Sequence, residues 1–348
     1  MSRAIYAVPI DPDTPPARAE VVNFLKVDEL PMGISRLFVE LVGDGLASGI
    51  RVPVLVAKGT DGPTFGITAC IHGNELNGIP VIHRLFRELD VSTVRGTIVG
   101  VVALNVPGLH LKQRGFIDGT DLNRIMPGKP NGSIPDVYAY RILERIVDQF
   151  DYLLDLHTAS YGRVNSLYVR ADMKNTRTAA MAYLQSPEII VHNPASDTTL
   201  RGAAMDRGIP AITVEIGNPG VWQERYTSGA YEGVMAVLKH EGFIEGKARR
   251  SDSAPPVLCS SSSWMYTDRG GLLEVFPKLV QRLTEGEEVA IVRDAFGNVI
   301  RRYQAGRNGI VIGKSINPVG QTGARILHLG VVEPVEGVMR PRDCGLDE

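Results

Sequence analysis

The sequence predicts an α/β fold, in which helices flank a mixed sheet, followed by a small all-β domain. Three observations carry this prediction. Short apolar runs typical of buried strands alternate with segments whose apolar residues have helical spacing. The chain of 348 residues is long enough for about two domains. Beyond residue 256 the pattern changes to short runs at hairpin spacing, separated by Gly-containing turns.

The composition is that of an ordinary globular protein, with 44% hydrophobic and 22% charged residues. A formal net charge of −2 argues against a dedicated nucleic-acid binder, which usually has a strong basic excess. No signal-peptide core and no run of about 18 apolar residues occurs, so we expect a cytoplasmic protein without a membrane partner. The three cysteines, Cys70, Cys259 and Cys344, are too few and too scattered for a disulfide framework or a thiolate metal site.

The first half of the chain shows strand signals followed by a long connection. Three runs between residues 35 and 71 predict strands, and a helix is expected over about 77–89. The continuous apolar run at 97–105 predicts a central strand. Residues 106–132 are rich in Gly, Pro, Asn and Asp without clear periodicity. Connections of this length in a compact domain are often functional.

The clearest helix is predicted over 133–150. It begins with a capping-box-like Ser and Asp pair, and its apolar residues recur at helical spacing. The runs at 151–157 and 211–217 predict two further buried strands. A closing helix is expected at 231–242, with Gly242 as its C-cap.

These patterns divide the chain into four parts. The polar segment 246–256 ends in two prolines and is expected to be a linker. Before it lie an N-terminal segment (1–34) and an α/β domain (35–245) that holds the catalytic motifs. After it comes a C-terminal β domain (257–348), whose role stays open.

The residues best suited to chemistry stand at the ends of three expected core strands. His72 and Glu75 follow the first strand, His157 ends the second and Glu215 ends the third. In open α/β sheets ligands bind beyond the carboxyl ends of the strands, so we expect these groups to converge. Two imidazoles and one carboxylate form a ligand set suited to catalytic zinc with an open fourth position.

Each of these groups also has a plainer structural interpretation. An isolated H-x-x-E arises by chance in many chains, and a histidine at a strand end is more often simply hydrogen-bonded. Glu215 is the candidate general base beside the metal, but a buried carboxylate paired with an arginine would give the same pattern. Asp155 could orient the ring of His157 or only hydrogen-bond at the sheet end. Their joint placement favours the metal site.

The long connection supplies cations. Arg114 and Arg124 lie on either side of Asn123 in this Gly-rich loop. Arginine binds carboxylates bidentately, and a fixed cation can stabilise the oxyanion of a carbonyl under attack. A single loop arginine is more often a surface residue, but the combination favours substrate binding.

Four segments, HGNE, DLNR, DLHT and GIPAITVEIG, together resemble the succinylglutamate desuccinylase/aspartoacylase family, relatives of the zinc carboxypeptidases. The preceding stretch VPVLVAKGTDGPTFGITACIHGNE is also similar, and the resemblance covers about residues 35–335. It implies a zinc-carboxypeptidase-like mixed sheet in the α/β domain. The motifs are specific for the superfamily and much less specific for the substrate.

The resemblance also implies roles for the residues of these motifs. His72, Glu75 and His157 would bind one Zn²⁺ per active site, and Glu215 would be the general base and acid. The loop residues implied are Arg114, which would polarise the scissile carbonyl, and Asn123 and Arg124, which would hold the substrate carboxylate. The expected reaction is hydrolysis of a small-molecule N-acyl amino acid to a carboxylate and a free amine.

Tyr161, Arg163 and Arg201 are additional candidates for substrate binding, each with a surface or packing alternative. The histidines outside the motifs are expected to be structural: His83, His110, His192, His240 and His328. Two other functions stay open, a metallocarboxypeptidase acting on peptides and a non-catalytic zinc-binding module. The first shares the chemistry, and the second would normally close its zinc site with a fourth protein ligand. The acyl group, the amino acid, the metal used in vivo and the formation of a homo-oligomer also stay open.

Overall fold

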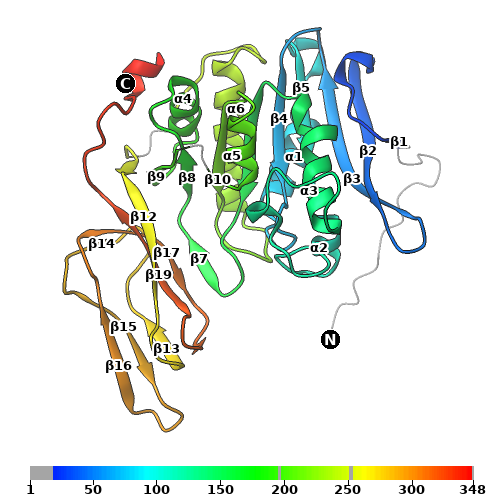
Figure 1. Ribbon diagram of the computed structural model, residues 1–348. Helices are drawn as coiled ribbons and strands as arrows, with labels where there is room; N and C mark the ends of the chain where they lie inside the picture. Colours follow the sequence, from blue (N-terminus) through cyan, green and yellow to red (C-terminus); the bar gives the residue numbers. More distant parts are fainter. Residues whose placement is uncertain (1–18, 195–196, 251–253, 347–348) are drawn as a thin grey trace, which may run out of the picture.

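A ten-stranded mixed sheet is the largest element of the computed structural model, which describes residues 19–194, 197–250 and 254–346 (Figure 1). Residues 1–18 of the expected N-terminal segment and 251–253 of the expected linker lie outside the described residues. The sheet has the order β1-β2-β3-β5-β4-β6-β10-β8-β9-β11. Its strands are β1 (Glu20–Val22), β2 (Gly33–Gly43), β3 (Gly49–Lys58), β4 (Thr64–Ala69), β5 (Thr97–Val101), β6 (Tyr152–His157), β8 (Tyr168–Ala171), β9 (Ile189–His192), β10 (Ala211–Glu215) and β11 (Val257–Cys259).

The centre of the sheet is parallel. β5, β4, β6 and β10 pair in parallel, whereas β3 and β8 join this centre in antiparallel orientation. Every residue of β4 and β5 is buried, which explains why these strands are nearly continuous apolar runs rather than alternating ones. The carboxyl ends of the four parallel strands therefore open on the same edge of the sheet.

Helices cover both faces of the sheet, as the alternation of strands and helices predicts. Buried side chains of α1, α4 and α6 pack on one face, and those of α3 and α5 pack on the other. Within the described residues no helix is both long and apolar enough to cross a membrane. The helices are α1 (Gly78–Glu88), α2 (Val106–His110), α3 (Ile134–Arg145), α4 (Thr176–Leu184), α5 (Leu200–Met205) and α6 (Glu224–His240).

The boundaries of several elements differ from the prediction for local reasons. The capping box of α3 is present, with Asp136 accepting hydrogen bonds from the amide and hydroxyl of Ser133, but the α-helix ends at Arg145 and a 3₁₀ turn follows. The 106–132 connection is not structureless, because it contains α2 and a 3₁₀ turn at Leu122–Arg124. α6 begins seven residues earlier than the apolar periodicity indicates, since its first turns face solvent and carry no apolar stripe.

The expected C-terminal β domain is confirmed as two antiparallel sheets. One has the order β12-β19-β17-β14 and the other β16-β15-β13-β18, and their inner faces enclose a separate apolar core. The strands are β12 (Ser261–Tyr266), β13 (Gly271–Val275), β14 (Arg282–Leu283), β15 (Glu288–Arg293), β16 (Val299–Gln304), β17 (Gly309–Ser315), β18 (Val319–Gly320) and β19 (Arg325–Val331).

Strand pairing crosses the boundaries that the sequence suggests. β1, in the expected N-terminal segment, pairs with β2, and β11, in the expected β domain, pairs with β9, so the large sheet extends past both limits. Three-residue strands are too short for periodicity to reveal, and pairing at a sheet edge satisfies their backbone groups. In the other direction, β7 (Arg163–Asn165) leaves the α/β part and pairs with β17 (Figure 1). The division into parts otherwise stays a proposal.

Candidate active site

The ends of β4, β6 and β10 bring four polar side chains together. His72 and Glu75 lie in the turn that joins β4 to α1, while His157 and Glu215 are the last residues of their strands. In the parallel pairing of β6 with β10, Glu215 stands directly beside His157. The sheet topology thus produces the convergence at the carboxyl edge that the sequence predicts.

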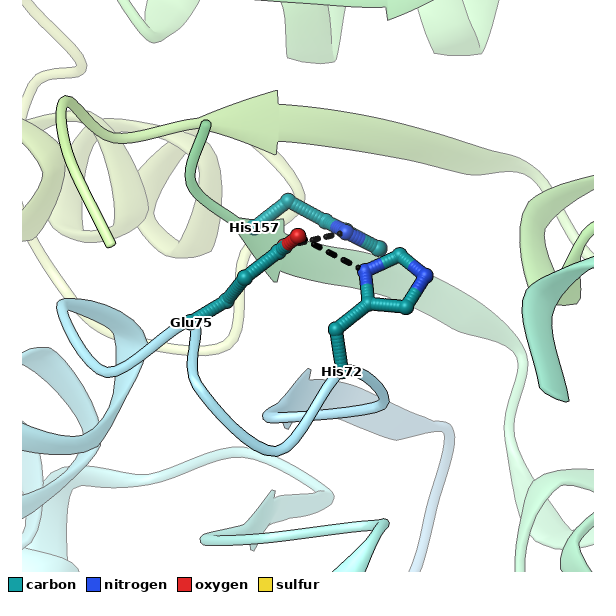
Figure 2. Close-up of side chains that lie close together, drawn as sticks. All are labelled: His72, Glu75 and His157. Carbon is teal, nitrogen blue, oxygen red and sulfur yellow. Dashed lines mark hydrogen bonds and ion pairs between the residues drawn. The ribbon is translucent and has the colours of Figure 1, made fainter. Parts of the chain in front are cut away.

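The Glu75 carboxylate lies between two imidazoles (Figure 2). Its Oε1 is 2.9 Å from Nδ1 of His72, and its Oε2 is 3.0 Å from Nδ1 of His157. One donor atom from each of the three side chains lies within 4.8 Å of the others, and all three side chains are buried. This group can hold a metal ion.

One of the two imidazole nitrogens that lie beside Glu75 is left without a hydrogen bond, which fits a metal-binding role. Nδ1 of His72 is buried and has no hydrogen-bond partner in the described residues, although Oε1 of Glu75 is only 2.9 Å away. A cation bound among the three side chains would give this buried nitrogen a partner. Two imidazole nitrogens and one carboxylate oxygen are the donors of three-ligand catalytic zinc sites.

Carboxylates also hold the outer nitrogen of each imidazole. Oδ2 of Asp155 is 2.7 Å from Nε2 of His157, and Oδ1 of Asp121 is 3.1 Å from Nε2 of His72. Burial disfavours the charged ring of His157, but Asp155 and Glu75 outweigh it and raise the pKa of His157 well above its ordinary value. Such outer carboxylates orient metal-binding imidazoles and fix their tautomers.

Arg114 reaches the same group from the long connection. Its Nη1 donates to Oε1 of Glu75 at 2.8 Å and to the Ser160 hydroxyl at 2.5 Å, and its Nε donates to Asp121 at 3.0 Å. Burial alone would lower the pKa of Arg114, but Glu75 and Asp121 outweigh it and raise the pKa. A fully charged guanidinium is therefore fixed beside the three donor side chains.

Glu215 is held by neutral donors. Its Oε1 accepts from the Tyr168 hydroxyl at 3.1 Å and its Oε2 from the Asn165 amide at 3.2 Å. Within the described part of the chain no Lys or Arg forms an ion pair with Glu215, which removes the structural interpretation as half of an arginine pair. Burial is the main cause that raises the pKa of Glu215. A carboxyl group in this environment is suited to exchange protons near neutral pH.

These groups lie in a cavity of about 390 Å³, which also receives most of the other predicted substrate-binding residues. Arg124 and Arg163 line it, the first exposed and the second half-buried. Asn123 also lines it, but its Oδ1 accepts from the Leu200 amide at 2.7 Å, so only its Nδ2 remains to donate to a substrate.

Two predicted residues are placed differently. Tyr161 is 82% exposed and does not line the cavity, so the structure does not bring it together with the others. Arg201 lines the cavity but is buried, and it donates to Asp197 at 2.6 Å and to the Asn193 carbonyl at 3.1 Å. The guanidinium of Arg201 therefore already has protein partners.

The β domain supplies lining residues that sequence reasoning missed. His328 is expected to be structural, but it lines the cavity, where its ring stacks on Trp264 with centroids 4.9 Å apart. Arg325 lines the cavity too, and on the α/β side Tyr168 and Arg170 do so. None of these positions lies in a recognisable motif. Only the proximity of the two parts of the fold reveals them.

Comparison with known proteins agrees with this geometry. A family model described as succinylglutamate desuccinylase/aspartoacylase catalytic domain matches residues 61–241. N-alpha-acetyl-L-2,4-diaminobutyric acid deacetylase of Halomonas elongata is 27% identical over 276 residues, which are 75% of this chain and 80% of that protein.

Solved structures of related proteins share the fold. The product-bound ectoine utilization protein EutE (DoeB) from Ruegeria pomeroyi superposes with a TM-score of 0.79 at 23% identity, covering 87% of this chain and 98% of that chain. A succinylglutamate desuccinylase/aspartoacylase from Rhodobacter sphaeroides gives a TM-score of 0.78 at 22% identity, covering 88% and 98%. The family model spans more than half of the chain and includes both imidazoles and both carboxylates of the site. The chain therefore belongs to the succinylglutamate desuccinylase/aspartoacylase family.

Proposed function

We propose that this protein hydrolyses the amide bond of a small N-acyl amino acid with the help of one zinc ion. The observation that carries the proposal is a half-buried carboxylate, Glu215, beside the donors of His72, Glu75 and His157 in one cavity. The similar protein from Halomonas elongata bears the name of an N-acetyl-amino-acid deacetylase, which agrees with this reaction.

Nδ1 of His72, Nδ1 of His157 and the Glu75 carboxylate would hold the ion. When bound, zinc polarises a carbonyl group and lowers the pKa of water to about 7. The choice of zinc rests on the donor set, since borderline nitrogen ligands combined with one carboxylate suit it well.

We assign the role of proton carrier to Glu215. In its ionised form it would take the proton of the attacking water, and it would then return a proton to the departing amine. Hydrogen bonds from Tyr168 and Asn165 hold the two carboxylate oxygens in place for both steps. Burial raises the pKa of Glu215, which makes its protonated form a better-populated acid in the second step.

Arg114 and the Asn123–Arg124 pair would bind the substrate. Arg114, fixed by Glu75, Asp121 and Ser160, can donate to the oxygen on which negative charge develops. Arg124 makes no side-chain hydrogen bond within the described residues and is free for the α-carboxylate of the substrate.

The two alternative functions make different predictions. A carboxypeptidase needs room for a peptide, whereas the cavity of about 390 Å³ is walled on one side by the β domain. A non-catalytic zinc site would normally be closed by a fourth protein ligand. Here the next nearest carboxylate, Glu215, is instead held by Tyr168 and Asn165.

The test measures amine release from a panel of N-acyl amino acids by zinc-loaded protein. We expect turnover by the wild type, loss of turnover on chelation and recovery with zinc. Glu215→Gln should lower kcat by about 10²–10⁴-fold at unchanged zinc content. The exposed residue Glu232 on α6 provides the matched control, and Glu232→Gln should behave as wild type.

Other results of this test would contradict the role of Glu215 or support one of the two alternative functions. Full turnover by zinc-loaded Glu215→Gln would show that the base is assigned wrongly. Cleavage of peptides without cleavage of acyl amino acids would support the carboxypeptidase. Stoichiometric zinc binding without any hydrolysis would support the binding module.

A further inference from the structure

The two oxygens of the Glu215 carboxylate are held by donors from different parts of the fold. Oε1 accepts from the hydroxyl of Tyr168 on β8, a strand of the large sheet that pairs with β10 at Glu215. Oε2 accepts from Nδ2 of Asn165 at 3.2 Å. Asn165 is the last residue of β7, which pairs with β17 of the β domain (Figure 1). The orientation of this carboxylate therefore depends on a strand outside the large sheet.

The end of β7 is tied closely to β17. Gly313 on β17 stands opposite Asn165 in the antiparallel pairing of the two strands. The next residue, Ser166, donates both its amide and its hydroxyl to the Ile312 carbonyl, each at 3.0 Å. Asn165 and Ser166 are both buried. Because strand pairing and two buried hydrogen bonds act at adjacent residues, the β domain fixes the backbone that carries the Asn165 side chain.

The Asn165 side chain fits against Gly313 because this residue has no side chain of its own. A Cβ atom at position 313 would overlap Oδ1 of Asn165, and it would lie 3.0 Å from the carbonyl oxygen of Val164. The Asn165 side chain would then have to rotate, and its Nδ2 would leave Glu215. A glycine inside a strand often marks such a close approach of another chain segment. Gly313 thus leaves the space that the hydrogen bond to Glu215 requires.

The stability of the fold does not explain an amide at position 165. Oδ1 of Asn165 is buried and has no hydrogen-bond partner within the described residues. A buried acceptor without a partner destabilises the folded state. Nδ2, at the same end of the side chain, donates to Glu215, and both residues line the cavity. The contact with Glu215 therefore gives this amide a functional explanation.

We propose that the β domain positions the general base, since Gly313 leaves room for Asn165 and the Asn165 amide holds Oε2 of Glu215 in place. Asn165 and Gly313 are then positioning residues, because they act through Glu215 and not on the substrate. A carboxylate held at one oxygen alone can still rotate about its last bond, whereas a second donor fixes its plane. The inference rests on the proposed function, in which Glu215 is the base, and it assigns a role to the β domain.

The first test separates positioning of Glu215 from substrate binding and from folding. It uses zinc-loaded protein and an N-acyl amino acid that the wild type hydrolyses. Asn165→Ala and Gly313→Ala should each lower kcat about 10–100-fold, because a hydrogen bond to a charged group is lost, while KM changes less than about threefold. Zinc content should stay at the wild-type level. Gly306→Ala, between β16 and β17, is the control, because an added Cβ there would meet no atom within 4 Å.

A double-mutant cycle tests whether Gly313 acts through Asn165. In the Asn165→Ala background the overlapping oxygen is absent, so Gly313→Ala should lower kcat further by less than about twofold. Multiplicative losses of the two single variants would overturn the inference, and so would wild-type kcat in Asn165→Ala. If Gly313→Ala alone does not fold, the double variant should fold and have the kcat of Asn165→Ala. A double variant that also failed to fold would show that Gly313 acts elsewhere.

An NMR measurement separates this inference from the proposed function. The side-chain amide resonances of Asn165, identified by their loss in Asn165→Ala, should shift in Glu215→Gln and in Gly313→Ala but not in Gly306→Ala. Such shifts without hydrolysis of any N-acyl amino acid would keep the contact between the β domain and Glu215 and reject the function. Hydrolysis together with Asn165 resonances that Gly313→Ala leaves unchanged would reject only the inference.

Discussion

The Asp155 carboxylate lies 2.7 Å from Nε2 of His157, the ring nitrogen opposite the one that faces Glu75. Thr68 in turn donates to the other oxygen of Asp155 at 2.8 Å. A carboxylate at Nε2 favours the tautomer in which Nδ1 is free to bind a cation. Asp155, two positions before His157 on the same strand, therefore decides which ring nitrogen His157 would offer to a metal ion.

Replacing this carboxylate should weaken metal binding. Asp155→Asn keeps the size of the side chain but removes the negative charge that orients and polarises His157. We expect zinc affinity to fall about 10–100-fold, as is typical when such an outer partner is lost. Competition with a chromophoric chelator measures this change. Asp148→Asn, at a half-exposed surface pair with Arg207, is the control, and equal affinities of the two variants would contradict the role of Asp155.

The hydrogen bond from Tyr168 to Glu215 should influence the pH at which kcat/KM falls on the acid side of its pH profile. Burial raises the pKa of Glu215, and the Tyr168 hydroxyl opposes this effect because it stabilises the ionised carboxylate. Tyr168→Phe therefore raises the pKa of Glu215 further. Since the ionised form of Glu215 is the proposed base, we expect activity to be lost as the pH falls through this pKa.

The acid limb of kcat/KM should consequently move to higher pH in Tyr168→Phe, with a larger loss of activity at pH 6 than at pH 8. A pH series of kcat/KM measures the shift. Tyr140→Phe, which removes a hydroxyl that contacts Glu144 on α3, should leave the profile unchanged. A uniform loss of activity at every pH would indicate a structural effect of Tyr168 alone.

Gly73, between His72 and Glu75 in the β4–α1 turn, should not tolerate a side chain. A Cβ atom at this position would collide with the backbone of Gly108 and Leu109 in α2. Gly73→Ala must therefore displace the turn that carries His72 and Glu75. We expect a loss of about 1–3 kcal/mol in the free energy of unfolding and weaker zinc binding.

Gly229 in the middle of α6 offers the matched control. The nearest atom to an added Cβ there is Leu167 Cδ2, at 4.0 Å. Gly229→Ala should stabilise the protein by up to about 1 kcal/mol, because alanine has the higher helix propensity. Denaturant unfolding compares the two variants. A Gly73→Ala protein as stable as wild type would show that the turn and α2 separate easily.

His328 should make the folded state sensitive to acid. Burial and the charges of Arg170 and Arg325 hold the pKa of His328 well below its ordinary value. In the unfolded chain this imidazole binds a proton near pH 6.5, whereas in the folded protein it stays neutral at that pH. The free energy of unfolding therefore decreases as the pH falls below 6.5.

Replacing His328 should reduce this cost. The free energy of unfolding should decrease from pH 7 to pH 5 in both proteins. This decrease should be smaller in His328→Gln than in wild type, by up to about 2 kcal/mol. Denaturant unfolding at the two pH values, at equal zinc loading, measures the difference. His240→Gln, at the end of α6, should show the wild-type dependence. Identical pH dependence of His328→Gln and wild type would mean that His328 titrates normally in the folded protein.

The parts of the site that could be predicted from the sequence are those in which local order determines position. The buried strand ending at His157, the turn from His72 to Glu75 and the end of β10 at Glu215 follow from short apolar runs with a polar residue after them. The topology of parallel strands then brings these ends together. The capping box at Ser133 is equally local, and the sequence predicts it too.

Other features depend on partners that lie far apart along the chain. Tyr161 and Arg163 are two positions apart, but only Arg163 lines the cavity, because β7 pairs with β17. The sequence offers Arg201 as a candidate for substrate binding, but its guanidinium group donates to Asp197. No local sequence pattern predicts that Arg163 lines the cavity or that Arg201 pairs with Asp197.

The sequence by itself determined the α/β class, the C-terminal β domain and the family, and it predicted the group of two imidazoles and a carboxylate at strand ends that could hold a metal ion. These features follow from residue type and from periodicity over fewer than about 20 positions. Only the tertiary structure decided that Trp264 and Arg325 join Arg163 at the cavity. That contact depends on the pairing of strands about 150 residues apart, and the register of such a pairing is set by packing rather than by neighbours in the chain.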